Sequence, residues 1–411
     1  MKAEIKKENS FQKTIFSIYP NDWNLIPLAK LAQIATGTTP PTNDKSNYGE
    51  DFLFVGPSDL GKTKWILDAE KKLSAKGFNL ARRFPKHSIL FTCIGSTIGK
   101  SGMASKELTS NQQINAIFPN DSYSSDFLFY QLSLLSNFIK KQAGEQAVPL
   151  INKSKFGEFI IPFPPTRTEQ TAIATALSDM DALIEGLEKL LVKKRNIKQG
   201  AMQDLLKPKD GWKIKKLGQI GKTYGGLSGK SKNDFKNGTI PYIPFMNIMS
   251  NPIISVTYFD YVKIDASENQ NKVQKGDLFF NTSSETPEEV GMCSVLLEDI
   301  PNLYLNSFCF GFRFHKETKD DGLYLSYFFR SSYGRKKLYL LAQGATRYNL
   351  SKSNFLKIKL ELPTPEEQIC IAQILYDIDT ELNQLETELS KYKMLKTGMM
   401  QELLTGKKRL I

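Results

Sequence analysis

The chain has 411 residues, of which 40% are hydrophobic, 11% aromatic and 24% charged, a globular composition that excludes general disorder and suggests two or three domains. Fifty-five Lys and Arg residues against 43 Asp and Glu give a net charge of +12, which both halves share and which favours a polyanionic partner such as nucleic acid. No apolar run is long enough to span a membrane, and the charged start MKAEIKKENS lacks a signal core, so we expect a cytoplasmic protein. The four cysteines and two histidines show no zinc-ligand spacing, so we expect the cysteines to be buried, reduced thiols.

The first globular module is predicted over residues 1–164. It opens on the string PNDW, and strand patterns follow at 88–93 (SILFTC) and 159–163. A helical pattern covers 125–142, and the polar string TGTTPPTNDKSN is typical of an exposed loop. The module is therefore expected to be α+β.

A long helix is predicted over 165–207. Thr166 and Glu169 have the spacing of a capping box, in which the Thr hydroxyl accepts an orphan amide and the Glu reaches back. Apolar residues then recur at spacings of four and three: Ile173, Leu177, Met180, Ile184, Leu187 and Leu191. This stripe predicts a coiled-coil seam, and the alternative is an amphipathic helix packed on its own module.

The second module, predicted over 208–362, is a divergent repeat of the first. Trp23 and Trp212 each follow a Pro-x-Asp signal, and Gly144 matches Gly344. Strand patterns lie at 277–280, 309–314 and 358–362, and a helical pattern covers 323–341. The string YGGLSGKSKNDFKNG again reads as a loop, so this module is also expected to be α+β.

A second long helix is predicted within 363–411, and it repeats the first closely. Residues 165–206 and 363–404 align without a gap, with Thr364 and Glu367 as the second capping box and Pro365 at the first helical position. The second stripe has the same spacing: Ile371, Leu375, Ile378, Leu382, Leu385 and Leu389. The two modules diverge, so we expect them to perform different tasks. The two helices agree closely, so we expect them to perform the same task.

Geometry constrains how these parts connect. A helix of about 38 residues is about 57 Å long, and only residues 207–211 separate the end of the first helix from Trp212. The second module should then lie at the far end of the first helix, and the second helix should run back. We therefore expect two tandem modules separated by an antiparallel coiled coil, with pseudo-two-fold symmetry.

The chain lacks the usual patterns of catalysis. The string Gly95-Ser-Thr-Ile-Gly-Lys-Ser101 has one residue too few between its glycines for a phosphate-binding loop, and the second module lacks it. The nearest match to the pocket string of an adenine methyltransferase, Asn251-Pro252-Ile253-Ile254, lacks the aromatic residue. His87 and His315 are isolated, so the chain is predicted to be non-catalytic.

Two different basic modules on a rigid spacer suit a bipartite DNA site, whose half-sites on one face of the duplex lie about 34–36 Å apart. Basic side chains would neutralise phosphates, amides and guanidinium groups would read base edges, and loops that differ between the copies would set specificity. The DNA-contact candidates are Lys62, Lys64, Arg82, Arg83, Ser96, Thr97, Lys100, Gln112, Gln113, Lys230, Lys232, Asn281, Ser283, Ser284, Arg347 and Tyr348. For each of them an ordinary solvated or backbone-bonding role is the alternative.

The motifs resemble those of the DNA-specificity subunit of type I restriction–modification systems. The resemblance rests on PNDW, SILFTCIGSTIGKSGM, TRYNLSKSNF, the helix starts PTRTEQTAI and PTPEEQICIAQIL, and the helix ends GAMQDLL and GMMQELLTGKKRL, and it covers nearly the whole chain. GEQAVPL of the first module departs from the TRYNL pattern of the second. The resemblance implies a non-catalytic chain that binds double-stranded DNA and two methyltransferase subunits, with a restriction–translocation subunit in the full complex. S-adenosylmethionine, ATP and Mg²⁺ would be bound by those partners.

The paired helices would then also present one surface twice to the two methyltransferase copies. The repeated polar positions are the candidates for this docking: Asp179, Asp181, Glu188, Asp377, Asp379 and Glu386. A solvated helix face is the alternative for each. Three other functions stay open: a specificity subunit of a methylation-only complex, a coiled-coil scaffold without DNA readout, and a nucleotide-dependent nuclease or methylase.

Overall fold

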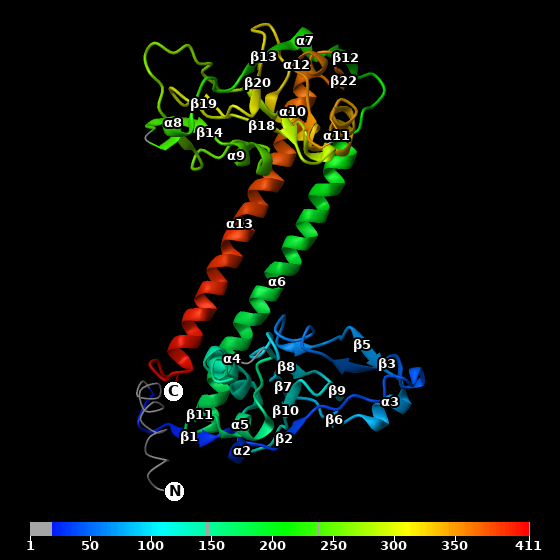
Figure 1. Ribbon diagram of the computed structural model, residues 1–411, viewed down its shortest axis with the longest axis vertical. Coiled ribbons are helices and arrows are strands. Elements are labelled where there is room, and N and C mark those ends of the chain that lie inside the picture. The colour runs from blue at the N-terminus through cyan, green and yellow to red at the C-terminus, as the bar shows by residue number, and fades with distance from the viewer. Residues whose placement is uncertain (1–18, 145–147, 237, 345, 411) are drawn as a thin grey trace. The chain divides into compact units, whose positions relative to one another are not determined.

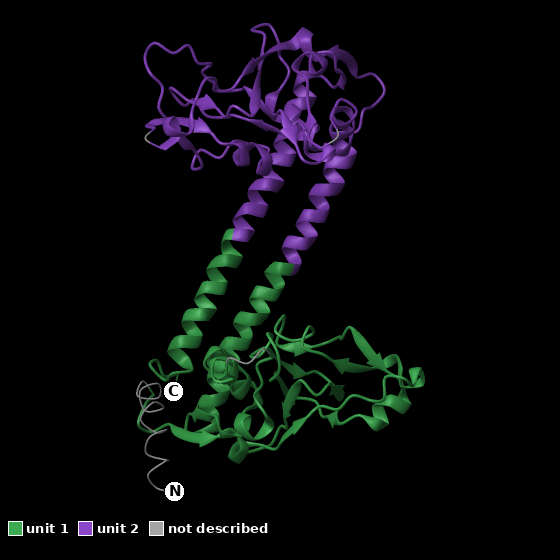
Figure 2. Ribbon diagram, viewed as in Figure 1, with its two compact units in different colours: residues 1–188, 387–411 green, residues 189–386 purple. Residues whose placement is uncertain are grey.

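A computed structural model describes residues 19–144, 148–236, 238–344 and 346–410 (Figure 1). The chain divides into two compact units, one formed by residues 1–188 with 387–411 and the other by 189–386 (Figure 2). We call them unit 1 and unit 2. The division cuts both long helices, so each unit contains one module together with a part of each helix.

Unit 1 is built on a mixed five-stranded sheet whose strands lie between residues 34 and 117. The five strands, in spatial order, are β2 (Ile34–Thr36), β10 (Ile114–Ile117), β7 (Ile89–Thr92), β8 (Ser101–Ala104) and β4 (Trp65–Ile66). A second sheet has the order β5 (Lys71–Leu73), β3 (Tyr48–Val55), β9 (Leu108–Ser110) and β6 (Arg83–Phe84), and β1 (Asn24–Pro27) pairs with β11 (Ile160–Phe163). The helices are α2 (Leu28–Leu31), η1 (Lys45–Asn47), α3 (Ala75–Leu80), α4 (Ser125–Lys141) and α5 (Lys153–Glu158). The predicted strands at 88–93 and 159–163 and the helix at 125–142 are confirmed.

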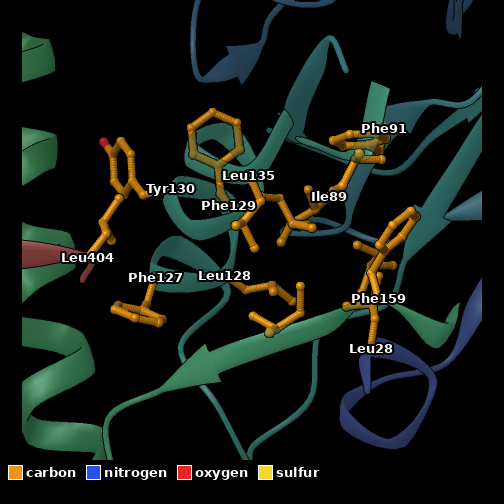
Figure 3. Close-up of a cluster of buried hydrophobic side chains, with 14 of the residues drawn as sticks. Leu28, Ile89, Phe91, Phe127, Leu128, Phe129, Tyr130, Leu135, Phe159 and Leu404 are labelled. Atoms are coloured by element: carbon orange, nitrogen blue, oxygen red, sulfur yellow. The ribbon is translucent and has the colours of Figure 1, made fainter. Parts of the chain in front are cut away.

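Helix α4 forms the centre of the unit 1 core. Its side chains Phe127, Leu128 and Leu135 pack with Ile89 and Phe91 of β7 (Figure 3). Ser124 begins the helix because its hydroxyl accepts a hydrogen bond from the amide of Phe127 at 3.3 Å. Full burial of each such side chain contributes about 1.5–3 kcal/mol.

Unit 2 repeats the central sheet with its own strands. Their order is β13 (Gly221–Gly225), β20 (Cys309–Phe314), β16 (Leu278–Asn281) and β18 (Cys293–Val295). The smaller sheets are β15 (Asp260–Val262) with β14 (Ile240–Ile243) and β19 (Tyr304–Leu305), β17 (Ser283–Ser284) with β21 (Tyr348–Asn349), and β12 (Lys213–Lys216) with β22 (Lys359–Leu362). The helices are α7 (Leu217–Ile220), α8 (Lys232–Lys236), α9 (Phe245–Ser250), η2 (Pro287–Glu289), α10 (Gly322–Arg330), α11 (Ser332–Tyr339) and α12 (Lys352–Phe355). The orders β2-β10-β7-β8 and β13-β20-β16-β18 are equivalent, so the repeat is one of structure as well as sequence.

The helix predicted over 323–341 is two helices in the structure. Ser331 has an extended backbone, with φ −73° and ψ 164°, and it ends α10. Its hydroxyl accepts a hydrogen bond from the amide of Gly334 at 3.3 Å and so begins α11. A serine at this position therefore acts as a cap rather than as a helix residue, which the apolar pattern alone did not reveal.

The two long helices are α6 (Arg167–Leu205) and α13 (Pro365–Leu403), each of 39 residues. Thr166 accepts from the amide of Glu169 at 3.2 Å and Thr364 from that of Glu367 at 3.3 Å, so the threonine halves of both capping boxes are confirmed. The carboxylate of Glu169 instead accepts hydrogen bonds from Arg409 on both oxygens. Pro365 is the first helical residue, as predicted.

The start of each apolar stripe packs in the core of one unit. Ile173 and Leu177 at the start of α6 belong to the core of unit 1, together with Leu403 at the end of α13 and Leu404 directly after it. Unit 2 is arranged in the same way, with Ile371, Ala372 and Leu375 of α13 packed near Leu206. The first turns of each stripe therefore pack on the helix's own module, which was the alternative to the seam.

Ion pairs give the direction of the helices within each unit. In unit 2, Lys194 pairs with Glu381 at 2.7 Å and Lys198 with Asp379 at 2.5 Å. In unit 1, Glu188 pairs with Lys393 at 2.6 Å and Asp181 with Lys396 at 2.5 Å. In these pairs the residue numbers rise along α6 as they fall along α13. The helices are therefore antiparallel in both units, as expected. The supercoil itself stays a prediction.

The thiols follow the sequence expectation only in part. Cys93, Cys293 and Cys309 are buried and free, whereas Cys370 on α13 is free and exposed. The expectation of a buried thiol is wrong for Cys370, because it lies on the side of α13 away from the apolar stripe. None of the described helices combines the length and the apolar character needed to cross a membrane.

Candidate nucleic-acid interface

The loop after strand β7 holds three of the predicted contact residues in unit 1. Gly95 and Gly99 have φ values of 86° and 98°, a conformation that favours glycine, and they shape the turn between β7 and β8. Ser96 and Lys100 are exposed, and Thr97 is half-buried. The segment after the turn is the strand β8 rather than a helix, so the geometry of a phosphate-binding loop is absent from this described segment.

A short strand segment lies beside this loop. Ile94 bridges to Leu150, and the amide of Gly95 donates to the carbonyl of Pro149 at 2.9 Å. Val148 and Leu150 expose 60% and 46% of their surface, so the segment is edged by apolar side chains. Residues 145–147 of the GEQAVPL string lie outside the described residues. We call 94–97 with 148–150 the paired edge of unit 1.

Unit 2 has an equivalent paired edge, made of residues 283–284 and 347–349. Ser283 pairs with Asn349 and Ser284 with Tyr348 in an antiparallel arrangement. The sequence placed both sets among its candidates, and the structure brings them together. The same pairing thus recurs on the same scaffold with different side chains.

A cavity of about 480 Å³ adjoins the paired edge of unit 2. Its lining includes Ser283, Ser284 and Arg347, with Met246 and Met249 from α9. Arg347 is exposed, and within the described residues its guanidinium makes no hydrogen bond or ion pair. A free guanidinium beside hydroxyls and flexible apolar side chains can donate to a phosphate or to a base edge.

Arg82 and Gln112 form a second cluster in unit 1, around the loop 36–39. Arg82 donates from its guanidinium to the carbonyl of Thr36 at 2.6 Å and from its amide to the Thr38 hydroxyl at 2.7 Å. Gln112 accepts from the Thr39 hydroxyl at 2.5 Å, which leaves the amide nitrogen of this exposed side chain available for donation. The TGTTPP string is therefore the loop on which these two side chains converge.

Gln113 is held beside that cluster by Asn111. The side-chain amide of Asn111 donates to the Gln113 side-chain oxygen at 3.1 Å, and the backbone amide of Gln113 donates to the Asn111 side chain at 3.0 Å. This local bonding matches the alternative role that the sequence left open for the pair.

Three predicted contact residues are held inside their modules. The side chain of Lys64 is 7% exposed, and its ammonium pairs with Asp126 at 2.5 Å and donates to Ser178 at 2.7 Å. The side chain of Lys230 is 4% exposed and pairs with Glu268 at 2.5 Å. Asn281 is fully buried, donates to the carbonyls of Ser283 and Glu289, and accepts from the amide of Met292. These bonds favour a structural role for all three.

The other basic candidates are exposed. Lys62 and Lys232 lie on the surface of units 1 and 2, respectively. Arg83 is also exposed, but its guanidinium lies over the Phe78 ring, 4.9 Å from the centroid, and bonds Asn79. Lys62 and Lys232 therefore suit phosphate contacts better than Arg83 does.

Asp181 and Asp379, predicted for partner docking, make equivalent hydrogen bonds and ion pairs within the chain. The Tyr130 hydroxyl donates to Asp181 at 2.6 Å, and the Tyr327 hydroxyl donates to Asp379 at 2.8 Å. Burial, with the nearby carboxylate, raises the pKa of both tyrosines, so they remain protonated donors. With the lysine pairs described above, each aspartate joins its module helix, its own long helix and the opposing long helix.

The remaining docking candidates differ in their environment. Glu188 pairs with Lys393 and Glu386 pairs with Arg195, both at 2.6 Å. Asp377 is exposed and accepts from Gln373 on the same helix at 2.7 Å. Asp179 is exposed and has neither a hydrogen bond nor an ion pair within the described residues. Asp179 and Asp377 are thus the pair of candidates that stays outside contacts between helices.

Sequence reasoning missed the role of two buried glutamines. Gln170 accepts from the amide of Ser124 at 3.0 Å and donates to the carbonyl of Pro164 at 3.2 Å. Gln368 does the same with Asp321 and Pro363, at 2.9 and 3.0 Å. Each glutamine therefore joins the first turn of a long helix to the capping residue that precedes the module helix. Their identity in both copies was the signal that could have revealed this.

Arg330 was also missed. Its guanidinium donates to the carbonyls of Ile248, Met249, Asn251 and Cys293. Burial lowers the pKa of Arg330 to about 10. Through these bonds to the carbonyls of α9, Arg330 holds this helix in place. The same helix contributes Met246 and Met249 to the lining of the cavity.

Comparison with known proteins agrees with this arrangement. The profile of the "Type I restriction modification DNA specificity domain" matches twice, at residues 20–193 and 209–391. The MjaIX specificity subunit of a type I restriction enzyme from Methanocaldococcus jannaschii is 29% identical over 62% of this chain and 65% of the relative, just under two thirds of that protein. The MjaVIII specificity subunit from the same organism is 24% identical over 98% of this chain and 97% of its own.

A solved structure shares the fold. The S subunit of a type I restriction–modification system from M. genitalium superposes with a TM-score of 0.60 at 18% identity, over 93% of this chain and 97% of its own. Both Methanocaldococcus jannaschii relatives are named specificity subunits, which agrees with the DNA specificity domain that the family model describes. The chain belongs to the family of type I restriction–modification DNA specificity proteins, as its motifs indicated.

Proposed function

We propose that the chain directs a type I methyltransferase complex to an asymmetric, bipartite DNA site, with one half-site bound by each module. The observation that supports this most strongly is the paired edge, which recurs on one scaffold with Ile94 and Leu150 in unit 1 and Ser283 and Asn349 in unit 2. Surface loops that differ on a shared framework are where two recognition specificities can diverge without loss of the fold.

The contacts that we assign to DNA are those with exposed or incompletely bonded donors. In unit 1 these are Arg82 and Gln112, and in unit 2 Arg347 with Ser283. An arginine reads guanine through two parallel hydrogen bonds, and a glutamine reads adenine in the same way. Lys62, Lys100 and Lys232 would neutralise phosphates and hold the modules on the duplex.

The helices α6 and α13 would set the interval between the half-sites and bind two methyltransferase subunits, with a restriction–translocation subunit in the full complex. S-adenosylmethionine, ATP and Mg²⁺ would be held by those partners in the cytoplasm. The exposed repeat pairs on the helices support this docking role: Asp179 with Asp377, and Ile197 with Leu395, which expose 46% and 47% of their surface.

Charge reversal tests the docking assignment. Asp179→Lys with Asp377→Lys should leave thermal unfolding unchanged and weaken copurification with the methyltransferase. Asp181→Lys with Asp379→Lys should instead lower the unfolding temperature, because it breaks the bonds to Tyr130 and Tyr327. If the first double variant copurifies as well as the parent chain, the docking assignment is wrong.

The function itself is tested by mapping adenine methylation in cells with and without this chain. We expect an interrupted, asymmetric methylated motif that disappears when the chain is deleted and returns when it is supplied again. A motif that persists without the chain would reject the proposal. A methylation-only complex is the second candidate, and cleavage of unmethylated DNA by the purified complex distinguishes the two.

A further inference from the structure

Unit 2 contains a cavity of about 880 Å³ between the start of its module and the first turn of α13. The lining includes Asp210, Trp212, Pro363 and Glu367. Within the described residues neither carboxylate, of Asp210 or of Glu367, makes an ion pair or accepts a hydrogen bond. A cavity of this size with two unpaired carboxylates suits a cationic side chain.

The corresponding place in unit 1 is filled by the end of the chain. After α13 the backbone turns at Gly406, where a Cβ atom would lie 2.5 Å from Pro20 and 3.1 Å from Trp23. The Arg409 guanidinium then binds both oxygens of Glu169 and lies 3.1–3.2 Å from those of Asp22. Unit 1 therefore shows an arginine held by two carboxylates, and the turn that leads to this arginine packs against Trp23.

The residues that hold Arg409 have repeat counterparts around the cavity. Glu367 occupies the position of Glu169 in the aligned helix starts, and Asp210 occupies that of Asp22 in the Pro-x-Asp signal. Trp212 corresponds to Trp23. The site that binds arginine in unit 1 thus exists in unit 2 without an arginine.

The way in which the chain connects its two halves explains why the site of unit 1 contains an arginine and the cavity of unit 2 does not. In unit 1 the chain end and the start of the module are separate segments that lie together. In unit 2 residues 207–211 form a single segment that leads from α6 directly into the module. The single segment 207–211 does not fill the space that two segments fill in unit 1. Trp212 is therefore half-buried, whereas its counterpart Trp23 is 5% exposed.

The charges around the cavity are mixed. Four lysines and four acidic residues line it, but Lys215 and Asp320 pair with each other at 2.7 Å. A guanidinium that forms two parallel hydrogen bonds with one carboxylate is recognised by geometry as well as by charge. The unpaired Glu367 and Asp210 provide the acceptors for such bonds.

We propose that this cavity binds an arginine-bearing segment of a partner protein, in the way that unit 1 binds Arg409. A partner is favoured over a second copy of this chain because the arginine of each copy is already bound in its own unit 1. The proposal does not depend on DNA recognition, so either can fail without the other.

The chain's own end provides the probe. A fluorescent peptide of residues 403–410 (LLTGKKRL) is titrated against the full-length chain, and anisotropy is followed. We expect saturable binding of one peptide per chain, weakened at least about tenfold by Arg409→Gln in the peptide or by Glu367→Gln in the protein. Glutamine has nearly the same shape as glutamate and leaves the bond from the backbone amide of residue 367 to Thr364 in place. Thermal unfolding verifies that the variant is folded.

Matched variants locate the binding. Glu317→Gln alters another carboxylate of the same cavity and should leave the peptide affinity unchanged. Absence of saturable binding would overturn the proposal, as would binding that Glu169→Gln weakens and Glu367→Gln does not. Concentration-dependent dimers that Arg409→Gln abolishes would also overturn it, since the occupant would then be a second copy.

Discussion

Arg347 combines an exposed guanidinium with a position on the paired edge of unit 2. Its neighbours in the cavity, Ser283 and Ser284, offer hydroxyl groups, and Met246 and Met249 offer flexible apolar contacts. Arg330 holds α9 in place through backbone carbonyls, so the apolar wall is fixed before any ligand arrives. A side chain in this setting is suited to selecting a base.

Removal of that guanidinium should relax one half of the DNA motif. Arg347→Ala should cost about 1–3 kcal/mol in discrimination at one position of the second half-site and leave the first half-site unchanged. The measurement is binding of the reconstituted complex to a panel of single-base variants. Lys232→Ala is the matched control, and it should weaken binding to all sequences alike. Equal effects of the two variants across the panel would show that Arg347 does not read sequence.

The Lys230–Glu268 pair gives unit 2 a pH dependence. The hydrogen bond from Lys230, with further bonds from Asp265 and Gln270, lowers the pKa of Glu268 from 4.5 to about 2. Because the folded pKa is depressed, the pair stabilises the fold above about pH 4.5, and this stabilisation is lost as the pH falls toward 2. Urea unfolding from pH 7 to pH 3 should show a smaller loss of stability for Glu268→Gln than for the parent chain. Parallel curves would contradict this.

Residue type alone could not separate surface cations from structural ones. Lys62 and Lys64 lie in the same short segment, yet Lys62 is exposed, whereas the side chain of Lys64 is only 7% exposed and pairs with Asp126. The partner is distant in the sequence, so only the fold reveals the ion pair. The same holds for Asn281, whose bonds to Glu289 and Met292 depend on the turn that follows β16.

At the scale of elements, the strands and helices with strong periodicity were predicted well. The pattern of β7 and the caps of α6 and α13 are local, and local physics determines them. The break at Ser331 was missed because a serine inside an apolar pattern can be either a helix residue or a cap. The short pairings of the paired edges depend on contacts between distant segments, which periodicity does not contain.

The buried glutamines make an element-scale prediction. Gln170→Leu should leave the amide of Ser124 and the carbonyl of Pro164 without partners and cost about 1–3 kcal/mol for each group. Gln368→Leu should have a similar effect through Asp321 and Pro363. Thermal unfolding measures both. Gln203→Leu, an exposed position on α6, is the control and should change stability by less than about 0.5 kcal/mol. Equal unfolding temperatures for all three variants would refute the role assigned to the glutamines.

At the scale of the whole molecule, the repeat carried most of the prediction. Sequence comparison found two modules that diverge and two helices that agree, and the structure shows the same central strand order in both units. The repeat also shows where the copies differ. Arg409 near the end of the chain binds Glu169 in unit 1, whereas Glu367, its counterpart in unit 2, lines a cavity. Neither the cavity nor the partners of Asp181 could be predicted, because both arise from packing between segments far apart in the chain.

The most direct measurement is genome-wide mapping of adenine methylation after module exchange. Residues 1–164 are replaced by the corresponding module of a related specificity protein, and both helices and the second module are retained. If each module reads its own half-site, one half of the interrupted motif changes while the other half and the spacing persist. Replacement of the entire motif by an unrelated sequence, or an unaltered motif, would contradict independent reading by two modules.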